Sequence, residues 1–285
     1  MAITGINTAP IKKDNRLHVM TFRFRDENRQ DRIIYMPLTT LVDFLMVLRS
    51  RTLKIAARLA QNDATYKAKT IAQAEALSQN IPAIFEQDVM QPDAGNLVMA
   101  FAPKFQEERF SLVMSMQNEQ IVMIEIEDLQ VEFIILAIRQ AIEAIQDHET
   151  MNIIASLLDF IQLCFVDLAS PDSEDYREIS HEGWKQALFN NHVAVLYCFD
   201  TEQGQQILAG TMMKCSEEEG SEGLDSIVKR VALMTPGLQA LQQKHRLCQT
   251  FARKVPTQPG QIVTKEFCHK TLRDYRAEAQ ASLNA

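Results

Sequence analysis

The feature that most constrains the fold is a strand-like segment followed at once by an apolar helix, and the chain contains it twice. One copy is the run 121–126, followed after an acidic corner by the apolar run 129–135. The other copy is the run 32–37 followed by 41–46, so that a Val-Asp/Glu-Phe signature recurs 89 positions later. Short runs rich in β-branched residues indicate strands, and longer apolar runs behind a capping residue indicate helices.

A further strand-like run precedes each copy, at residues 17–24 and 110–116. Each copy is therefore predicted to be a β-hairpin that leads into a helix, and residues 17–50 and 110–140 are predicted to share a fold. In the first run Phe22 and Phe24 lie on one face and Arg23 and Arg25 on the other. The predicted class is α+β, with repeated β-hairpin–helix units and additional long helices.

The length favours two domains, because a domain typically has roughly 100–200 residues. Residues 170–175 are polar and acidic and contain a proline, which is typical of a boundary. We expect an N-terminal domain over 1–170 with both hairpin–helix copies, and a smaller α+β domain over 171–285. The second domain is predicted to contain a hairpin around Gly204 and a helix over 224–234.

Several helices are expected outside the hairpins. The helix from residue 41 and two more at 129–146 and 151–168 are apolar on most faces, which indicates burial in a core or a subunit interface. The latter reading predicts a homo-oligomer. Further helices are predicted at 64–79, 238–253 and 265–283.

The sequence favours the cytoplasm. The N-terminus lacks a basic segment followed by an apolar run, and no stretch approaches the roughly 20 apolar residues of a spanning helix, so no membrane contact is expected. The five cysteines form an odd set without paired spacing, which fits a reducing compartment.

Charge is segregated along the chain. Residues 1–70 carry 13 Lys/Arg and 6 Asp/Glu, residues 71–243 carry 8 and 28, and residues 244–285 carry 8 and 3. Basic ends around an acidic middle can steer a protein partner or join two subunits. The alternative is that solvent-exposed faces differ in the sign of their charge without any role in binding.

No motif predicts an enzyme or a cofactor. The nine glycines form no phosphate-binding loop, and neither GxSxG nor HExxH occurs. His245, Cys248, Cys268 and His269 are the one metal-like set, but their spacing matches no known finger, and ordinary packing is favoured. We therefore assign no catalytic, cofactor-binding or metal-ligating residue.

Four carboxylates, Glu125, Glu127, Asp128 and Glu132, gather at the second strand-to-helix corner. Such a cluster can hold a divalent cation, which leaves a metal-dependent hydrolase as one alternative function. Helix capping is the favoured reading, because carboxylates stabilise the positive end of a helix.

The best candidates for contact with nucleic acid or an acidic partner are cations on the first hairpin and the helix after it. They are Arg23, Arg25, Arg29, Arg32, Arg51, Lys54 and Arg58. Clustered cations bind phosphates, and single strands also use aromatic platforms. Phe22 and Phe24 lie opposite the arginines, however, and are expected in the core, while the acidic pI of about 5.3 weakens this alternative.

The opening, from Ile11-Lys12-Lys13-Asp14-Asn15-Arg16 to Ile33-Ile34-Tyr35-Met36-Pro37-Leu38, resembles the YjeJ-like proteins, an uncharacterised enterobacterial family. The resemblance covers the whole chain and implies a bacterial cytoplasmic protein, but it supplies no active-site pattern. The preferred function is a non-enzymatic interaction protein that self-associates and binds a protein partner through its segregated charges.

Overall fold

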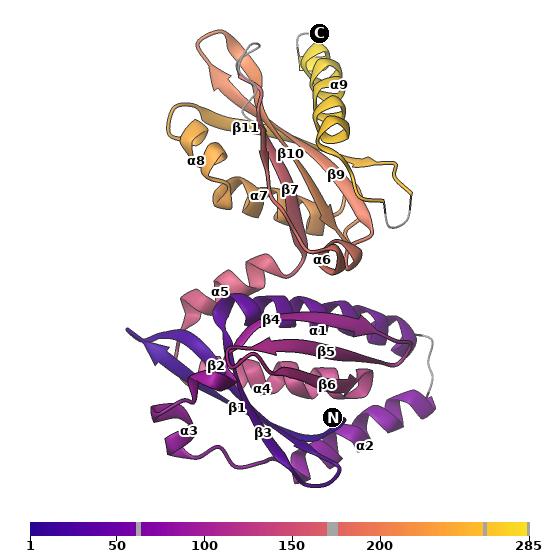
Figure 1. The fold of residues 1–285 in the computed structure, drawn as a ribbon. Helices are drawn as coiled ribbons and strands as arrows, with labels where there is room; N and C mark the ends of the chain where they lie inside the picture. The colour runs from indigo at the N-terminus through magenta and orange to yellow at the C-terminus, as the bar shows by residue number, and fades with distance from the viewer. Residues whose placement is uncertain (61–63, 170–175, 259–260, 284–285) are drawn as a thin grey trace. The chain divides into compact units, whose positions relative to one another are not determined.

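The computed structural model describes residues 1–60, 64–169, 176–258 and 261–283. The chain divides into two compact units, Met1–Leu158 and Asp159–Ala285, called unit 1 and unit 2 (Figure 1). Both mix strands and helices, which confirms the α+β class. The domain boundary predicted at residue 170 lies outside the described residues.

Unit 1 contains two three-stranded antiparallel sheets, each followed by a helix. The first half is β1 (Ile3–Lys13), β2 (Arg16–Asp26), β3 (Asp31–Pro37) and α1 (Leu38–Leu59). The second half is β4 (Val98–Phe105), β5 (Arg109–Met116), β6 (Ile121–Glu127), the short 3-10 turn η2 (Asp128–Gln130) and α4 (Val131–Glu143). Between them lie α2 (Ala64–Gln79), α3 (Glu86–Met90) and the turn η1 (Ala94–Asn96), and α5 (His148–Leu157) ends the unit.

Each half contains the predicted hairpin and helix: residues 17–50 lie in β2, β3 and the first part of α1, and residues 110–140 lie in β5, β6 and most of α4, with the turns between them. That the two halves are an internal repeat stays a prediction. The sequence did not predict the extra strands β1 and β4. Both are outer strands of their sheets and contain a proline, Pro10 and Pro103, which is tolerated at a sheet edge but weakens the strand pattern.

The core of unit 1 forms where α1 and α4 pack on the inner faces of the sheets. Phe22 and Phe24 are fully buried there, as predicted, and the Phe22 ring lies 5.8 Å from that of Phe44 on α1. From residue 41 to 48 every α1 side chain except Asp43 is buried. This part of the apolar surface that suggested a subunit interface is thus covered within the unit, whereas Leu136 of α4 and Ile153 of α5 are 48% and 41% exposed.

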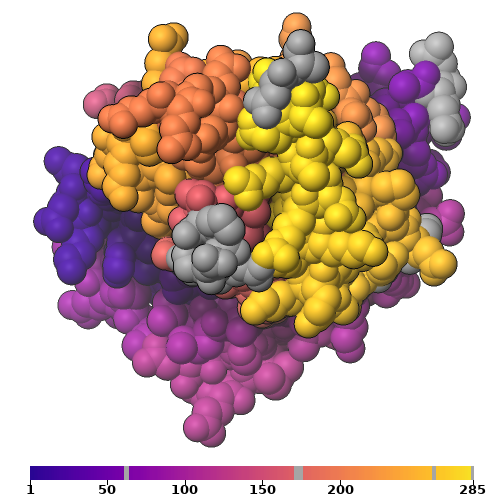
Figure 2. Space-filling view, turned by 90° about the horizontal axis from the view of Figure 1, so that it is seen from above, coloured from indigo at the N-terminus to yellow at the C-terminus, as the bar shows by residue number. Residues whose placement is uncertain are grey.

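Unit 2 is a five-stranded antiparallel sheet of order β11-β9-β10-β7-β8 with helices on both faces. Its elements are β7 (Phe160–Asp167), β8 (Tyr176–Glu178), α6 (Gly183–Ala187), β9 (Asn191–Thr201), β10 (Gly204–Cys215), α7 (Glu222–Met234), α8 (Pro236–Gln242), β11 (Arg246–Val255) and α9 (Lys265–Leu283). The side chains of α7 and α8 pack with Val195 and Phe199, while Leu272 of α9 reaches Gly210 and Leu196. Figure 2 shows α9, in yellow, on the surface of the unit.

Two predicted helices were wrong. Residues 151–168 are not one helix, since α5 ends at Leu157 and β7 follows. Residues 238–253 likewise divide into the short α8 and the strand β11. A strand covered on both faces is apolar at nearly every position, as in Phe160–Asp167, and such a run cannot be told from a buried helix by periodicity.

The other helices match more closely. α2 and α9 have the predicted bounds, and α7 begins two residues earlier than predicted. The hairpin around Gly204 is formed by β9 and β10. Among the helices of the described residues, none is long and apolar enough to cross a membrane.

Candidate functional site

The outer face of the first sheet, which is turned away from α1 and α4, is covered by residues 80–90, here called the covering segment. Asn7 of β1 donates from Nδ2 to the carbonyl oxygen of Pro82 at 2.8 Å. Tyr35 of β3 donates from its hydroxyl to the carbonyl oxygen of Asp88 at 2.9 Å. The covering segment is therefore attached to both outer strands of the sheet.

Arg23, on the middle strand β2, also holds the covering segment. Its Nη1 donates to the Ala83 carbonyl oxygen at 2.5 Å and lies 3.0 Å from a carboxylate oxygen of Asp88. Its guanidinium carbon lies 5.1 Å from the centre of the Phe85 ring, within cation–π range. This predicted phosphate-binding residue thus makes an intramolecular attachment.

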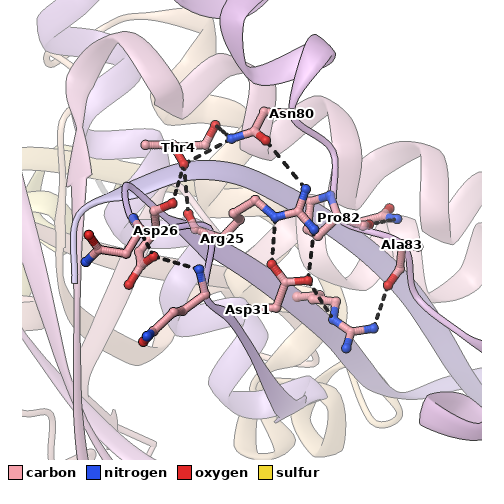
Figure 3. A network of polar contacts seen from close by, with 11 residues as sticks. Thr4, Arg25, Asp26, Asp31, Asn80, Pro82 and Ala83 are labelled. Carbon is pink, nitrogen blue, oxygen red and sulfur yellow. Dashed lines mark hydrogen bonds and ion pairs between the residues drawn. The ribbon is translucent and has the colours of Figure 1, made fainter.

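Arg25, two residues along β2, forms a bidentate pair with Asp31 at 2.7 and 2.9 Å (Figure 3). This hydrogen bonding lowers the pKa of Asp31 below its ordinary value. Asn80, at the start of the covering segment, donates from Nδ2 to the Thr4 carbonyl oxygen at 3.0 Å. The outward arginines of the first hairpin are therefore part of one polar network with β1 and the covering segment.

The other predicted cations do not extend this network into a single basic surface. Arg29 and Arg32 are exposed around the β2–β3 turn. Lys54 of α1 donates to the Glu107 carbonyl oxygen. Arg58 pairs with Glu108 at 2.9 Å.

Arg51 is buried, although it was predicted to contact a partner. Its Nε and Nη2 lie 2.5 and 2.6 Å from the two carboxylate oxygens of Asp128, and Nη2 also donates to the carbonyl oxygens of Gln106 and Glu107. The two side chains are 7% and 2% exposed, so each charge depends on the other. Because Arg51 lies on α1 and Asp128 opens η2, the pair joins the two halves of unit 1.

The acidic corner thus has structural partners. Besides Asp128, Glu125 pairs with Arg109 at 3.0 Å, and Glu132 lies in the first turn of α4, where it favours the positive end of the helix. Within the part of the chain that the structure describes, no three His, Cys, Asp or Glu side chains are arranged to hold a metal ion.

A cavity of about 470 Å³ lies beside this corner, between α1, α2 and the β4–β5 turn. It is lined by Arg58, Thr65, Tyr66, Lys69, Gln106, Glu107, Glu108, Arg109, Glu127, Asp128 and Leu129. Its size suits a small molecule, and its lining carries both charge signs. The guanidinium of Arg58 lies 4.6 Å from the Tyr66 ring centre.

The outer face of the second sheet differs from that of the first. Beyond the outward pair of Arg109 and Glu127, cross-strand pairing places the outward side chains in three rows that cross all three strands. These rows are Ala100–Ser115–Ile121, Ala102–Val113–Met123 and Lys104–Ser111–Glu125. Ile121 is 68% exposed and Met123 49%, and Figure 1 shows no described element of unit 1 in front of β4, β5 and β6.

Sequence reasoning did not identify this face, although a signal was present. Residues 121–126 are apolar at five of six positions, so both faces of β6 carry apolar side chains. On an antiparallel sheet with one solvated face, polar residues alternate with apolar ones. The departure from alternation in β6 therefore indicates that the outer face of this sheet carries apolar side chains as well.

The metal-like set of unit 2 is divided between β11, the bend before it and α9, which also contains His269. Cys248 lies on β11 and Cys268 on α9, and His245 precedes β11. Cys268 is buried, and hydrogen bonding to the Cys164 thiol together with burial raises its pKa, which keeps the thiol protonated. Packing, the favoured reading of this set, accounts for Cys268.

Comparison with known proteins gives a family. The chain is 27% identical to the protein named "Uncharacterized protein YjeJ" from Escherichia coli (strain K12), over 98% of this chain and 96% of that protein. No solved structure matches. The model of the YjeJ-like family matches residues 1–282, and the chain therefore belongs to the YjeJ-like family.

Proposed function

We propose that this chain is a cytoplasmic, non-enzymatic interaction protein whose docking surface is the outer face of the second sheet. The observation that supports this most directly is the contrast within unit 1. The first sheet has a covered outer face, whereas the second sheet exposes Ile121 and Met123 on its outer face. Exposed apolar patches rimmed by polar residues are typical of protein-binding surfaces.

The chemistry of this face defines the partner that would fit it. Two rows are small or apolar, and the third carries Lys104 and Glu125. A suitable partner presents an apolar surface with charges of both signs at one end. Self-association, which three apolar helices first suggested, is supported better by this face than by α1, whose apolar run 41–48 is buried.

The two alternative functions receive less support. For nucleic-acid binding, Arg23, Arg25 and Arg51 already contact carboxylates inside unit 1, which reduces the charge available to phosphates. For a metal-dependent hydrolase, the carboxylate of Asp128 is paired with Arg51. These ion pairs therefore support neither nucleic-acid binding nor metal-dependent hydrolysis.

Site-specific photo-crosslinking in living bacteria tests the proposal. A photoreactive residue at position 123 should give an adduct of one defined mass, and the same residue at position 233, an exposed site on α7, should not. The adduct should disappear when Ile121→Lys is added. Equal, weak labelling at 123 and 233 would argue against a docking surface on this sheet.

A further inference from the structure

We propose that Cys248 is a thiol-modification site, where a low-molecular-weight disulfide reacts and leaves an internal disulfide between Cys248 and Cys198. Cys248 lies on β11, an edge strand of the sheet of unit 2, and Cys198 lies on the neighbouring strand β9. Cys248 is partly exposed, whereas Cys198 is fully buried. An accessible thiol beside a second, resolving thiol is the usual arrangement of a reversible thiol site. This site is independent of the docking surface proposed for unit 1.

An irregularity in the strand pairing brings the two thiols to one face of the sheet. Leu247 pairs with Phe199 and Gln249 pairs with Cys198, so Cys248 is an extra residue in β11. Leu247 and Phe199 belong to the core beside α7, and their neighbours Cys248 and Cys198 therefore face the opposite side of the sheet. The Cys248 thiol donates to the backbone carbonyl oxygen of Cys198, with 3.3 Å between sulfur and oxygen. The bulge thus directs Cys248 toward Cys198.

The spacing of the two strands suits a disulfide. Facing residues of neighbouring antiparallel strands have Cα atoms about 4.5–5.5 Å apart, and disulfides join Cα atoms about 4.4–6.8 Å apart. Cys248 is one position away from the residue that pairs with Cys198, and the two thiols already share a hydrogen bond. Closing the bond therefore requires side-chain rotation and no rearrangement of the strands.

The surroundings assign different roles to the two cysteines. Burial, together with the hydrogen bond to Cys248, raises the pKa of Cys198 to about 12. Cys198 therefore remains a protonated thiol at neutral pH, whereas the attack on a disulfide requires a thiolate. Cys248 is also the member of the pair that a reagent in solution can reach. The first attack is thus assigned to Cys248, and Cys198 acts as the resolving thiol.

The reaction needs one small disulfide, RSSR, as the oxidant. In the first step the Cys248 thiolate attacks one sulfur of RSSR, which forms a mixed disulfide and releases RS⁻. In the second step Cys198 gives its proton to solvent and attacks the Cys248 sulfur, which breaks the mixed disulfide and releases a second RS⁻. The two cysteines lose two electrons and two protons, and RSSR is reduced to two RSH.

A second pair of thiols in unit 2 provides an internal comparison. Cys164 of β7 and Cys268 of α9 also share a hydrogen bond, but they are only 0% and 2% exposed. A reagent in solution therefore does not reach either sulfur while unit 2 is folded. Contact between thiols is common to both pairs, and exposure distinguishes them. Only the pair of Cys198 and Cys248 should be oxidised in the folded chain.

Oxidised glutathione is the probe that tests this site. The full-length folded chain is treated, quenched with acid and measured by intact mass and peptide mapping. The wild-type chain should lose two hydrogens and show a Cys198–Cys248 linkage. Cys248→Ala should stay unmodified, whereas Cys198→Ala should keep one glutathione at position 248 because no thiol is left to resolve it. Cys164→Ala, the matched control at the buried pair, should behave like the wild-type chain.

Two further measurements keep the test decisive. Thermal unfolding followed by circular dichroism checks that each variant is folded, and Cys198→Ser replaces Cys198→Ala if the latter is not. In urea all the cysteines should react, which shows that the reagent is active. A wild-type chain that reacts in urea but stays unmodified when folded would overturn the proposal. So would a first linkage between Cys164 and Cys268, or a glutathione adduct of Cys198→Ala at a position other than 248.

Discussion

The two sheets of unit 1 have the same strand order, and each is followed by a helix of its own. Their outer faces nevertheless differ, because one is covered by another segment of the unit and the other is not. The first carries Thr21, Arg23 and Arg25 and is covered by residues 80–90. The second carries Val113 and Met123 and has no such cover in the described unit. The polar outer face of the first sheet makes its contacts within the chain. The apolar outer face of the second sheet remains exposed, and its burial against another surface would be favourable.

The largest expected effect concerns the buried ion pair of Arg51 and Asp128, which joins the two halves of unit 1. Asp128→Ala leaves the Arg51 guanidinium buried without its carboxylate, which should lower the free energy of unfolding of unit 1 by about 3–5 kcal/mol. Urea denaturation followed by circular dichroism measures this loss. Glu107→Ala, at an exposed position whose backbone carbonyl alone contacts Arg51, is the control and should cost less than about 0.5 kcal/mol. Equal losses in the two variants would contradict a special role for the pair.

A second prediction compares the same change on the two outer faces. Thr21→Arg, on the middle strand of the first sheet, places a charge beneath the covering segment and should cost about 3 kcal/mol. Val113→Arg, on the middle strand of the second sheet, should cost less than about 1 kcal/mol because its surroundings are partly open. Chemical denaturation of both variants gives the comparison, and similar losses would mean that the second face is covered too.

A third prediction concerns the attachment of the covering segment. Arg23→Ala removes contacts to Ala83 and Asp88 and should cost about 1–2 kcal/mol. Amide hydrogen exchange should rise in residues 80–90 and stay unchanged in β5 and β6. Arg109→Ala, which removes an exposed pair on the second sheet, should leave both regions unchanged. Unchanged exchange in residues 80–90 would show that other contacts hold the segment.

The smallest expected effect on stability is that of Met123→Lys. Since this side chain is 49% exposed, the free energy of unfolding should change by less than about 0.5 kcal/mol. Association, measured by sedimentation, should nevertheless be lost. A large loss of stability would instead show that Met123 supports the fold of its own chain.

Local patterns predicted much of this fold because they report local structure. The bounds of α2 and α9 follow from continuous helix-forming sequence, and the burial of Phe22 and Phe24 follows from period-two alternation. The strand β7 was missed because burial on both faces removes that alternation. An edge strand such as β4, interrupted by Pro103, gives an equally weak pattern.

The roles of the charged residues were less accessible from sequence. Arg23 meets Asp88 across 65 positions, and Arg51 meets Asp128 across 77. The sequence shows that cations cluster on the first hairpin and helix. It does not show which distant carboxylates form ion pairs with them in the folded chain. The composition of the second sheet's outer face was hidden for a related reason, since its rows come from three strands whose register only the structure supplies.

The buried pair between Arg51 and Asp128 also has an evolutionary consequence. Either side chain alone would be a charge without a partner in the interior, so a lineage that loses one is under pressure to lose the other. Positions 51 and 128 should therefore change together among relatives, either as the pair or as two apolar residues of similar combined volume. Relatives with a single charge at these positions should be rare, however far their sequences have diverged.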